Sequence, residues 1–146
     1  MIIDGLLLFS SAQAITATAA STNVLDMVNA RDMGAADPEI QVAIFVGTAF
    51  STTNAGTLTI ALQGSTDNST FTTYAQSRAY TAADMPAGAK LLPIELPAKS
   101  TQDALPRYYR LNYTVANAFT AGTLTAMLVL DRQDRYDYPA GINITN

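Results

Sequence analysis

Apolar and polar residues alternate along several short segments of the chain, as they do in half-buried β-strands. The clearest case is segment 57–63, in which Leu58, Ile60 and Leu62 are predicted to face a core while threonine, alanine and glutamine face outward. A run of turn-forming residues occupies 64–69, and a second strand-like segment follows at 70–77. The pattern therefore predicts a β-hairpin over residues 57–77.

Other segments extend this pattern over most of the chain. Segment 40–46 is almost wholly apolar and ends at Gly47, which is typical of a central strand buried on both faces. Segments 108–113 and 122–130 alternate, and we expect them to pair antiparallel across the loop 115–121. Shorter candidates are segments 6–9, 15–18, 23–28 and 91–96.

Two details of these segments can be predicted more closely. Tyr109 and Tyr113 lie on the same side of their strand, and we expect both to pack in the core. A single helical turn is expected at 81–85, with Thr81 as its cap and Asp84 three residues on.

Strands of this number and spacing indicate the fold class. About eight short strands, punctuated by Gly and Pro and without helical crossovers, predict an all-β fold, an antiparallel β-sandwich of jelly-roll type. The length of 146 residues suits one domain. We expect a single jelly-roll domain over residues 1–131 and an extended C-terminal arm over residues 132–146.

Charge and composition narrow the classes of partner. Only 14% of the residues are charged, the net charge is −4 and the pI is near 4.4, so no basic stripe is available for nucleic acid or an anionic membrane. The chain has no Cys and no His, which removes thiolate nucleophiles, Ser-His pairs and the usual Zn ligands. The apolar start is interrupted by Asp4 and the first basic residue is Arg31, so we do not expect a secretory signal, and we expect a soluble protein.

The acidic residues offer two weak candidates for chemistry. Asp131, Asp134 and Asp137 recur at a spacing of three and suggest a Ca²⁺ site of oxygen ligands, but two intervening arginines compensate their charge and favour a solvated acidic turn. Glu39 and Glu95 do not form a recognisable catalytic pair. We therefore expect no catalysis, no cofactor, no metal and no small-molecule substrate.

Two segments are predicted to contact other proteins. The first is the apolar run near the N-terminus, which a small sandwich leaves partly exposed and which suggests a symmetric homodimer or another homo-oligomer: Leu6, Leu7, Leu8 and Phe9. The second is the C-terminal arm, whose aromatic, arginine and isoleucine side chains are of the kinds that anchor interfaces: Arg132, Arg135, Tyr136, Tyr138, Ile142 and Ile144. Alternatively, the arm folds back over the edge of its own sheet.

Several segments, taken in order, carry a resemblance to a known family. They are SAQAITATAASTNV at 11–24, RDMG at 31–34, RYYRLNY at 107–113, and FTAG at 119–122 with Asp131. Together they resemble the jelly-roll capsid cement (decoration) proteins of tailed bacteriophages. The resemblance runs over most of the chain and is weakest in residues 51–100.

The resemblance implies a structural virion protein. It implies a subunit that binds the outside of an icosahedral shell of major capsid proteins and stabilises it by bridging them, without cofactors or catalytic residues. It also implies a place on the capsid exterior, and in the host cytoplasm before assembly. Two alternatives stay open: a carbohydrate- or receptor-binding β-sandwich of a phage tail fibre, which would use the tyrosines as a platform, and a hydrolase with an unrecognised carboxylate site.

Overall fold

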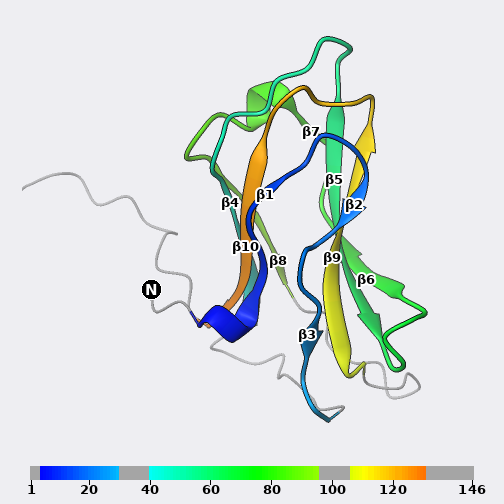
Figure 1. The fold of residues 1–146 in the computed structure, drawn as a ribbon. Coiled ribbons are helices and arrows are strands. Elements are labelled where there is room, and N and C mark those ends of the chain that lie inside the picture. Colours follow the sequence, from blue (N-terminus) through cyan, green and yellow to red (C-terminus); the bar gives the residue numbers. More distant parts are fainter. Residues whose placement is uncertain (1–3, 30–39, 96–105, 131–146) are drawn as a thin grey trace, which may run out of the picture.

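The computed structural model of the chain describes residues 4–29, 40–95 and 106–130. These residues contain ten strands and two short 3-10 helices, η1 and η2 (Figure 1). Their bounds in chain order are η1 Gly5–Leu7, β1 Leu8–Ala14, β2 Ala19–Ala20, β3 Leu25–Asp26, β4 Ile40–Val46, β5 Thr57–Ser65, β6 Thr72–Gln76, β7 Tyr80–Thr81, η2 Ala82–Asp84, β8 Lys90–Glu95, β9 Tyr108–Ala116 and β10 Thr123–Leu130.

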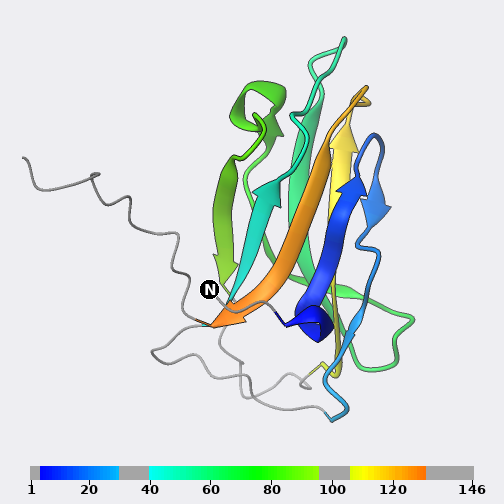
Figure 2. The ribbon, with the colours of Figure 1, turned by 60° about the vertical axis from the view of Figure 1, so that its left-hand side comes forward.

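The strands form two antiparallel sheets that face each other (Figures 1 and 2). Sheet A has the order β1-β10-β4-β8, and sheet B has the order β2-β9-β5-β6, with β3 also paired to β9 and β7 also paired to β5. Both β2 and β3 lie along β9, and both β6 and β7 lie along β5, so each pair acts as one interrupted strand. The resulting eight strands divide four and four between the sheets, and successive strands change sheet except at the β5–β6 hairpin. The predicted all-β jelly-roll sandwich is confirmed.

The hairpin predicted over residues 57–77 is confirmed, because β5 pairs antiparallel with β6. The predicted core side chains Leu58, Ile60 and Leu62 are completely buried. Strand β4 lies between β10 and β8, so its predicted central position is confirmed as well. The hydrophobic period was sufficient for these predictions because each strand buries one or both of its faces.

The expected pairing of segment 108–113 with segment 122–130 is wrong. Strand β9 pairs with β5 along its whole length in sheet B, whereas β10 lies between β1 and β4 in sheet A. The connection over residues 117–122 therefore crosses from one sheet to the other. Alternation identifies the face that a strand buries but not the strand beside it, so two consecutive strands can meet face to face across the core instead of side by side.

The shorter candidate strands have mixed outcomes. Segment 91–96 corresponds to β8 and segment 23–28 contains β3, but segment 6–9 supplies only the start of β1. Segment 15–18 is a bend between β1 and β2, not a strand. The single turn predicted at 81–85 is confirmed as η2, with Thr81 and Asp84 forming a capping box.

The main core lies between the two sheets and includes both predicted tyrosines, Tyr109 and Tyr113. A second, smaller cluster of Ala43, Met127 and Val129 lies on the opposite face of β4 and β10. These two strands are therefore buried on both faces, as expected for the middle of a sheet. Within the ranges given above, no helix is long and apolar enough to cross a bilayer.

Candidate protein-binding surfaces

The predicted N-terminal interface residues fall into three environments. Leu6 lies in η1 and is 84% exposed, so it is accessible to a partner. Leu7 is half-buried against the main core, and Leu8 is half-buried against the second cluster on sheet A. Phe9 is completely buried between the sheets. The expectation that Phe9 belongs to an exposed patch is therefore wrong, because its side chain is part of the fold's own core.

The predicted C-terminal interface residues lie outside the described residues. They are Arg132, Arg135, Tyr136, Tyr138, Ile142 and Ile144. The aspartates at 131, 134 and 137 and Glu39 also lie outside them, so the candidate calcium turn remains a prediction. In the ranges that the structure describes, no three His, Cys, Asp or Glu side chains come together.

Four loops gather at one end of the sandwich, which we call the loop end: residues 15–18, 47–56, 82–89 and 117–122 (Figure 1). Backbone hydrogen bonds tie them together. The Phe119 amide donates to the Thr16 carbonyl at 3.0 Å, the Thr120 amide donates to the Ser51 carbonyl at 2.8 Å, and the Phe50 amide donates to the Met85 carbonyl at 3.1 Å. Loops that are distant in sequence thus hold one another in a fixed arrangement.

Aromatic packing and one glycine fix the loop end from beneath. The Phe50 and Phe119 rings meet edge to face with their centroids 5.0 Å apart. Gly122 has a φ of +147°, and a Cβ there would come within 2.4 Å of the Phe50 ring. Only glycine fits that position, because both the backbone conformation and the close approach exclude a side chain.

The exposed side chains of the loop end are short and uncharged. They include Thr16, Ala17, Thr48, Ala49, Thr53, Asn54, Ala83, Pro86, Ala87 and Ala118. Asp84 is the single charged residue in the four loops. Such a surface presents no charge that a partner must desolvate and few rotamers that binding must freeze.

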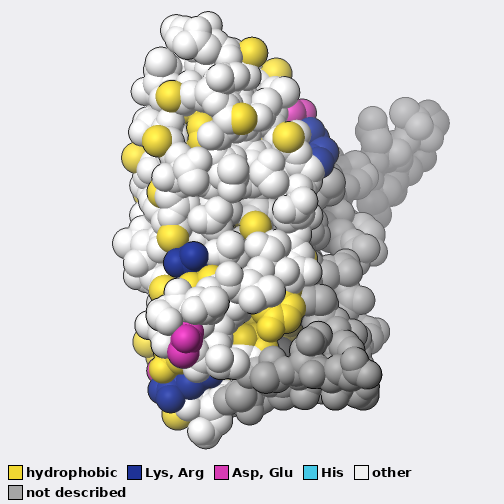
Figure 3. All heavy atoms as spheres, turned by 90° about the vertical axis from the view of Figure 1, so that its right-hand side faces the viewer, with side chains coloured by type: hydrophobic (Ala, Val, Ile, Leu, Met, Phe, Trp, Pro, Cys, Tyr) yellow, Lys and Arg dark blue, Asp and Glu magenta, His cyan; other side chains and the backbone are white. Residues whose placement is uncertain are grey.

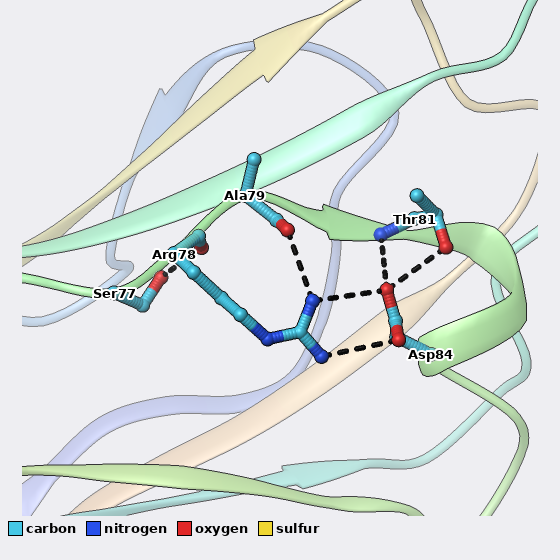
Figure 4. Close-up of polar contacts among 5 residues, drawn as sticks. All are labelled: Ser77, Arg78, Ala79, Thr81 and Asp84. Atoms are coloured by element: carbon cyan, nitrogen blue, oxygen red, sulfur yellow. Dashed lines mark hydrogen bonds and ion pairs between the residues drawn. The ribbon is translucent and has the colours of Figure 1, made fainter.

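The charge of Asp84 is itself compensated, as Figure 4 shows. Arg78 donates to both Asp84 carboxylate oxygens, at 3.2 and 3.1 Å, while the backbone amide and hydroxyl of Thr81 each donate to the same carboxylate at 2.8 Å. The hydrogen bonds from Arg78 and then from Thr81 hold the pKa of Asp84 well below its usual range. The carboxylate therefore stays ionised and belongs to the fold.

A second ion pair lies at the opposite end of sheet B. Arg107 donates to both Asp26 oxygens at 2.7 Å, joining β3 to the start of β9, and its guanidinium lies over the Tyr108 ring. The hydrogen bond from Arg107 lowers the pKa of Asp26. Both groups are substantially exposed, so this pair contributes little to stability.

The outer face of sheet B includes these outward side chains of β5 and β9: Thr57, Thr59, Ala61, Gln63, Arg110, Asn112 and Thr114. Figure 3 looks onto this side of the molecule and shows charged side chains in only a few separate places. Arg110 is the charged residue among those seven, and its guanidinium is held by Gln63 and Phe71. Arg110 was not predicted as a functional residue, although it is an arginine on the outward side of a strand with clear alternation.

A buried polar contact joins the two sheets. The Ser10 hydroxyl lies 2.7 Å from the Tyr113 hydroxyl and donates to the Gln13 side-chain carbonyl, also at 2.7 Å. The Gln13 side chain in turn donates to the Ala20 carbonyl in β2 and accepts from the amide and hydroxyl of Thr22 just after that strand. Burial raises the pKa of Tyr113 to about 12, so this hydroxyl stays protonated and structural.

Comparison with known proteins places the chain in a family. Residues 9–128, which include nearly all of the two sheets, match the sequence profile of the family described as Bbp16. A search of curated proteins found no match. The matched region runs from the buried Phe9 in β1 to Leu128 in β10, so it covers the sandwich itself. The chain therefore belongs to the Bbp16 family.

Proposed function

We propose that this chain is a capsid cement protein that binds the outside of a bacteriophage shell and stabilises it by bridging major capsid proteins. The resemblance of its ordered segments to phage cement proteins suggests this role, and a jelly-roll sandwich is compatible with it. The observation that carries the proposal is the loop end, a preformed and almost uncharged surface.

The loop end suits adhesion to a protein surface for two physical reasons. Its loops are already fixed by hydrogen bonds between them, so binding requires little ordering of the backbone. Its exposed residues are mainly alanine, threonine, serine, asparagine, glycine and proline, which lose little rotamer entropy on contact. A weak contact of this kind becomes effective when it is repeated over a whole shell.

The two predicted segments would add contacts besides the loop end. Leu6 is exposed beside the sandwich and can add an apolar contact to the shell or to a second copy of the chain. The arm over residues 132–146 would extend the reach of the subunit to a neighbouring capsid protein. Deleting residues 132–146 should abolish decoration of empty shells while the circular dichroism spectrum stays that of a β-protein.

The tyrosine platform of a tail-fibre protein is not proposed for this chain. Tyr109 is only 8% exposed and Tyr113 is fully buried, so neither can stack on a sugar. Tyr108 lies under the guanidinium of Arg107. These three tyrosines are therefore engaged within the fold and are not available as a platform.

A pair of matched substitutions tests the role of the loop end. Thr53 in the loop end and Thr66 in the β5–β6 turn are both exposed, and neither side chain has a hydrogen bond within the described residues. Thr53→Lys should weaken co-sedimentation with purified expanded empty shells about tenfold, because the contact must then desolvate a charge. Thr66→Lys adds the same charge at the far end and should not weaken binding. Equal binding by both variants would contradict the assignment of the loop end.

A further inference from the structure

Arg110 differs from the other described arginines in what holds it. Arg78 donates to Asp84, and Arg107 donates to Asp26, so each of these guanidinium groups has a carboxylate partner. Arg110 is held by two uncharged side chains. Its positive charge is therefore not compensated by a direct partner anywhere in residues 4–29, 40–95 and 106–130.

The geometry around Arg110 fixes the guanidinium in place. Its Nε donates to the Gln63 side-chain carbonyl at 2.9 Å, and Gln63 is its cross-strand neighbour on β5. Its Cζ lies 3.8 Å from the centroid of the Phe71 ring. One edge and one face of the Arg110 guanidinium are thus engaged. The side chains that engage them, Gln63 and Phe71, belong to half-buried residues.

The remaining edge of the guanidinium carries the two terminal amino groups. Neither has a hydrogen-bond or ion-pair partner in the part of the chain that the structure describes. This edge presents parallel N–H donors at the spacing that a carboxylate accepts in a bidentate contact. Because the group is already oriented, binding a carboxylate would freeze few additional torsions.

The position of Arg110 matters for a subunit that bridges. Strand β5 starts next to the loop end at Thr57 and finishes at Ser65, so Gln63 and its neighbour Arg110 lie toward the far end of sheet B. A bridging subunit requires two separate contact surfaces, and the loop end supplies only one. The other six residues named on this face of β5 and β9 are uncharged. Asp26 on β3 pairs with Arg107, so its charge is already compensated.

We propose that Arg110 forms a bidentate salt bridge with an aspartate or glutamate side chain of a capsid subunit, as a second contact separate from the loop end. This inference rests on the proposed cement function. The positive guanidinium and the orientation of its open edge select a carboxylate, and the neutral surroundings on sheet B strengthen the interaction relative to a fully solvated pair.

Three variants test the proposal by titration against purified expanded empty shells. Arg110→Gln removes the charge, Arg110→Lys keeps the charge but removes the planar pair of donors, and Lys90→Gln removes a charge from an exposed residue of sheet A. Arg110→Gln should raise the apparent Kd about tenfold or more, and Arg110→Lys should recover only a small part of that loss. Lys90→Gln should change it less than about twofold.

The outcomes separate this proposal from the one on which it rests. If the wild type binds shells and both Arg110 variants bind equally well, the carboxylate contact is refuted while the cement function stands. If Arg110→Lys binds like the wild type, a simple point charge suffices and the bidentate contact is wrong. If the wild type fails to bind at all, both proposals fail. Thermal denaturation of each variant establishes that it is folded, so that lost binding reports on the contact.

Discussion

The buried contact between Ser10 and Tyr113 gives a quantitative prediction about what joins the two sheets. A carbonyl oxygen only accepts hydrogen bonds, so the single Ser10 proton goes to Gln13, and the Tyr113 hydroxyl must donate to Ser10. Tyr113→Phe removes this donor and leaves the bond from Ser10 to Gln13 intact. The free energy of unfolding should fall by about 1 kcal/mol.

Removing the other partner should destabilise the protein more. Ser10→Ala leaves the Tyr113 hydroxyl buried without its acceptor and takes a donor from Gln13, so the free energy of unfolding should fall by about 2–3 kcal/mol. In the double variant, Ser10→Ala with Tyr113→Phe, the buried hydroxyl that lacks an acceptor is absent. The loss should therefore be about 1 kcal/mol smaller than the sum of the two single losses.

Urea denaturation followed by circular dichroism at neutral pH measures this double-mutant cycle. A loss of 1 kcal/mol corresponds to a melting-temperature shift of about 2–4 °C for a chain of this size, so thermal denaturation gives an independent check. Ser11→Ala serves as the control, because Ser11 is the exposed neighbour on the same strand. Losses that add within about 0.3 kcal/mol in the double variant would refute the assigned hydrogen bond.

Three further predictions concern pH and one loop. Burial raises the pKa of Tyr113 to about 12 from its usual value of 10.0, so the unfolded chain loses this proton at a lower pH than the folded chain. The free energy of unfolding should therefore fall by up to about 3 kcal/mol as the pH rises from 10 to 12. Tyr113→Phe should remove that part of the alkaline loss, and an unchanged alkaline limb in urea titrations would argue against it. The hydrogen bonds from Arg78 lower the pKa of Asp84, so stability should fall as the pH drops below the usual value of 3.8, and Asp84→Asn should flatten this acid limb in thermal melts. Gly122→Ala should destabilise the protein by more than about 2 kcal/mol, because Gly122 has a positive φ and a Cβ there would collide with the Phe50 ring. A Cβ at Gly5 meets no atom within 4 Å, so the control Gly5→Ala should melt like the wild type.

The comparison of sequence with structure shows what alternation can and cannot determine. The buried faces of β4 and β5 were predictable because the apolar period of a strand directly reports its burial. The partner of β9 was not predictable, because pairing depends on how eight strands close into two sheets. The turn η2 was predictable from Thr81 and Asp84 because a capping box is a local interaction.

The surfaces were harder to predict than the strands. An apolar run near a terminus suggested exposure, but a bulge in β1 turns both Phe9 and Ser10 inward. The loop end and the fixed guanidinium of Arg110 depend on contacts between residues far apart in sequence, such as the bond between Thr16 and Phe119. A single sequence carries no direct signal of such contacts.

The central claim is that the chain binds and stabilises a capsid. Differential scanning calorimetry of purified expanded empty shells, with and without saturating wild-type protein, tests it most directly. The account predicts saturable binding and a higher temperature for the disruption of decorated shells. The account would be contradicted if the mixed shells bound no protein and were disrupted at the same temperature as untreated shells.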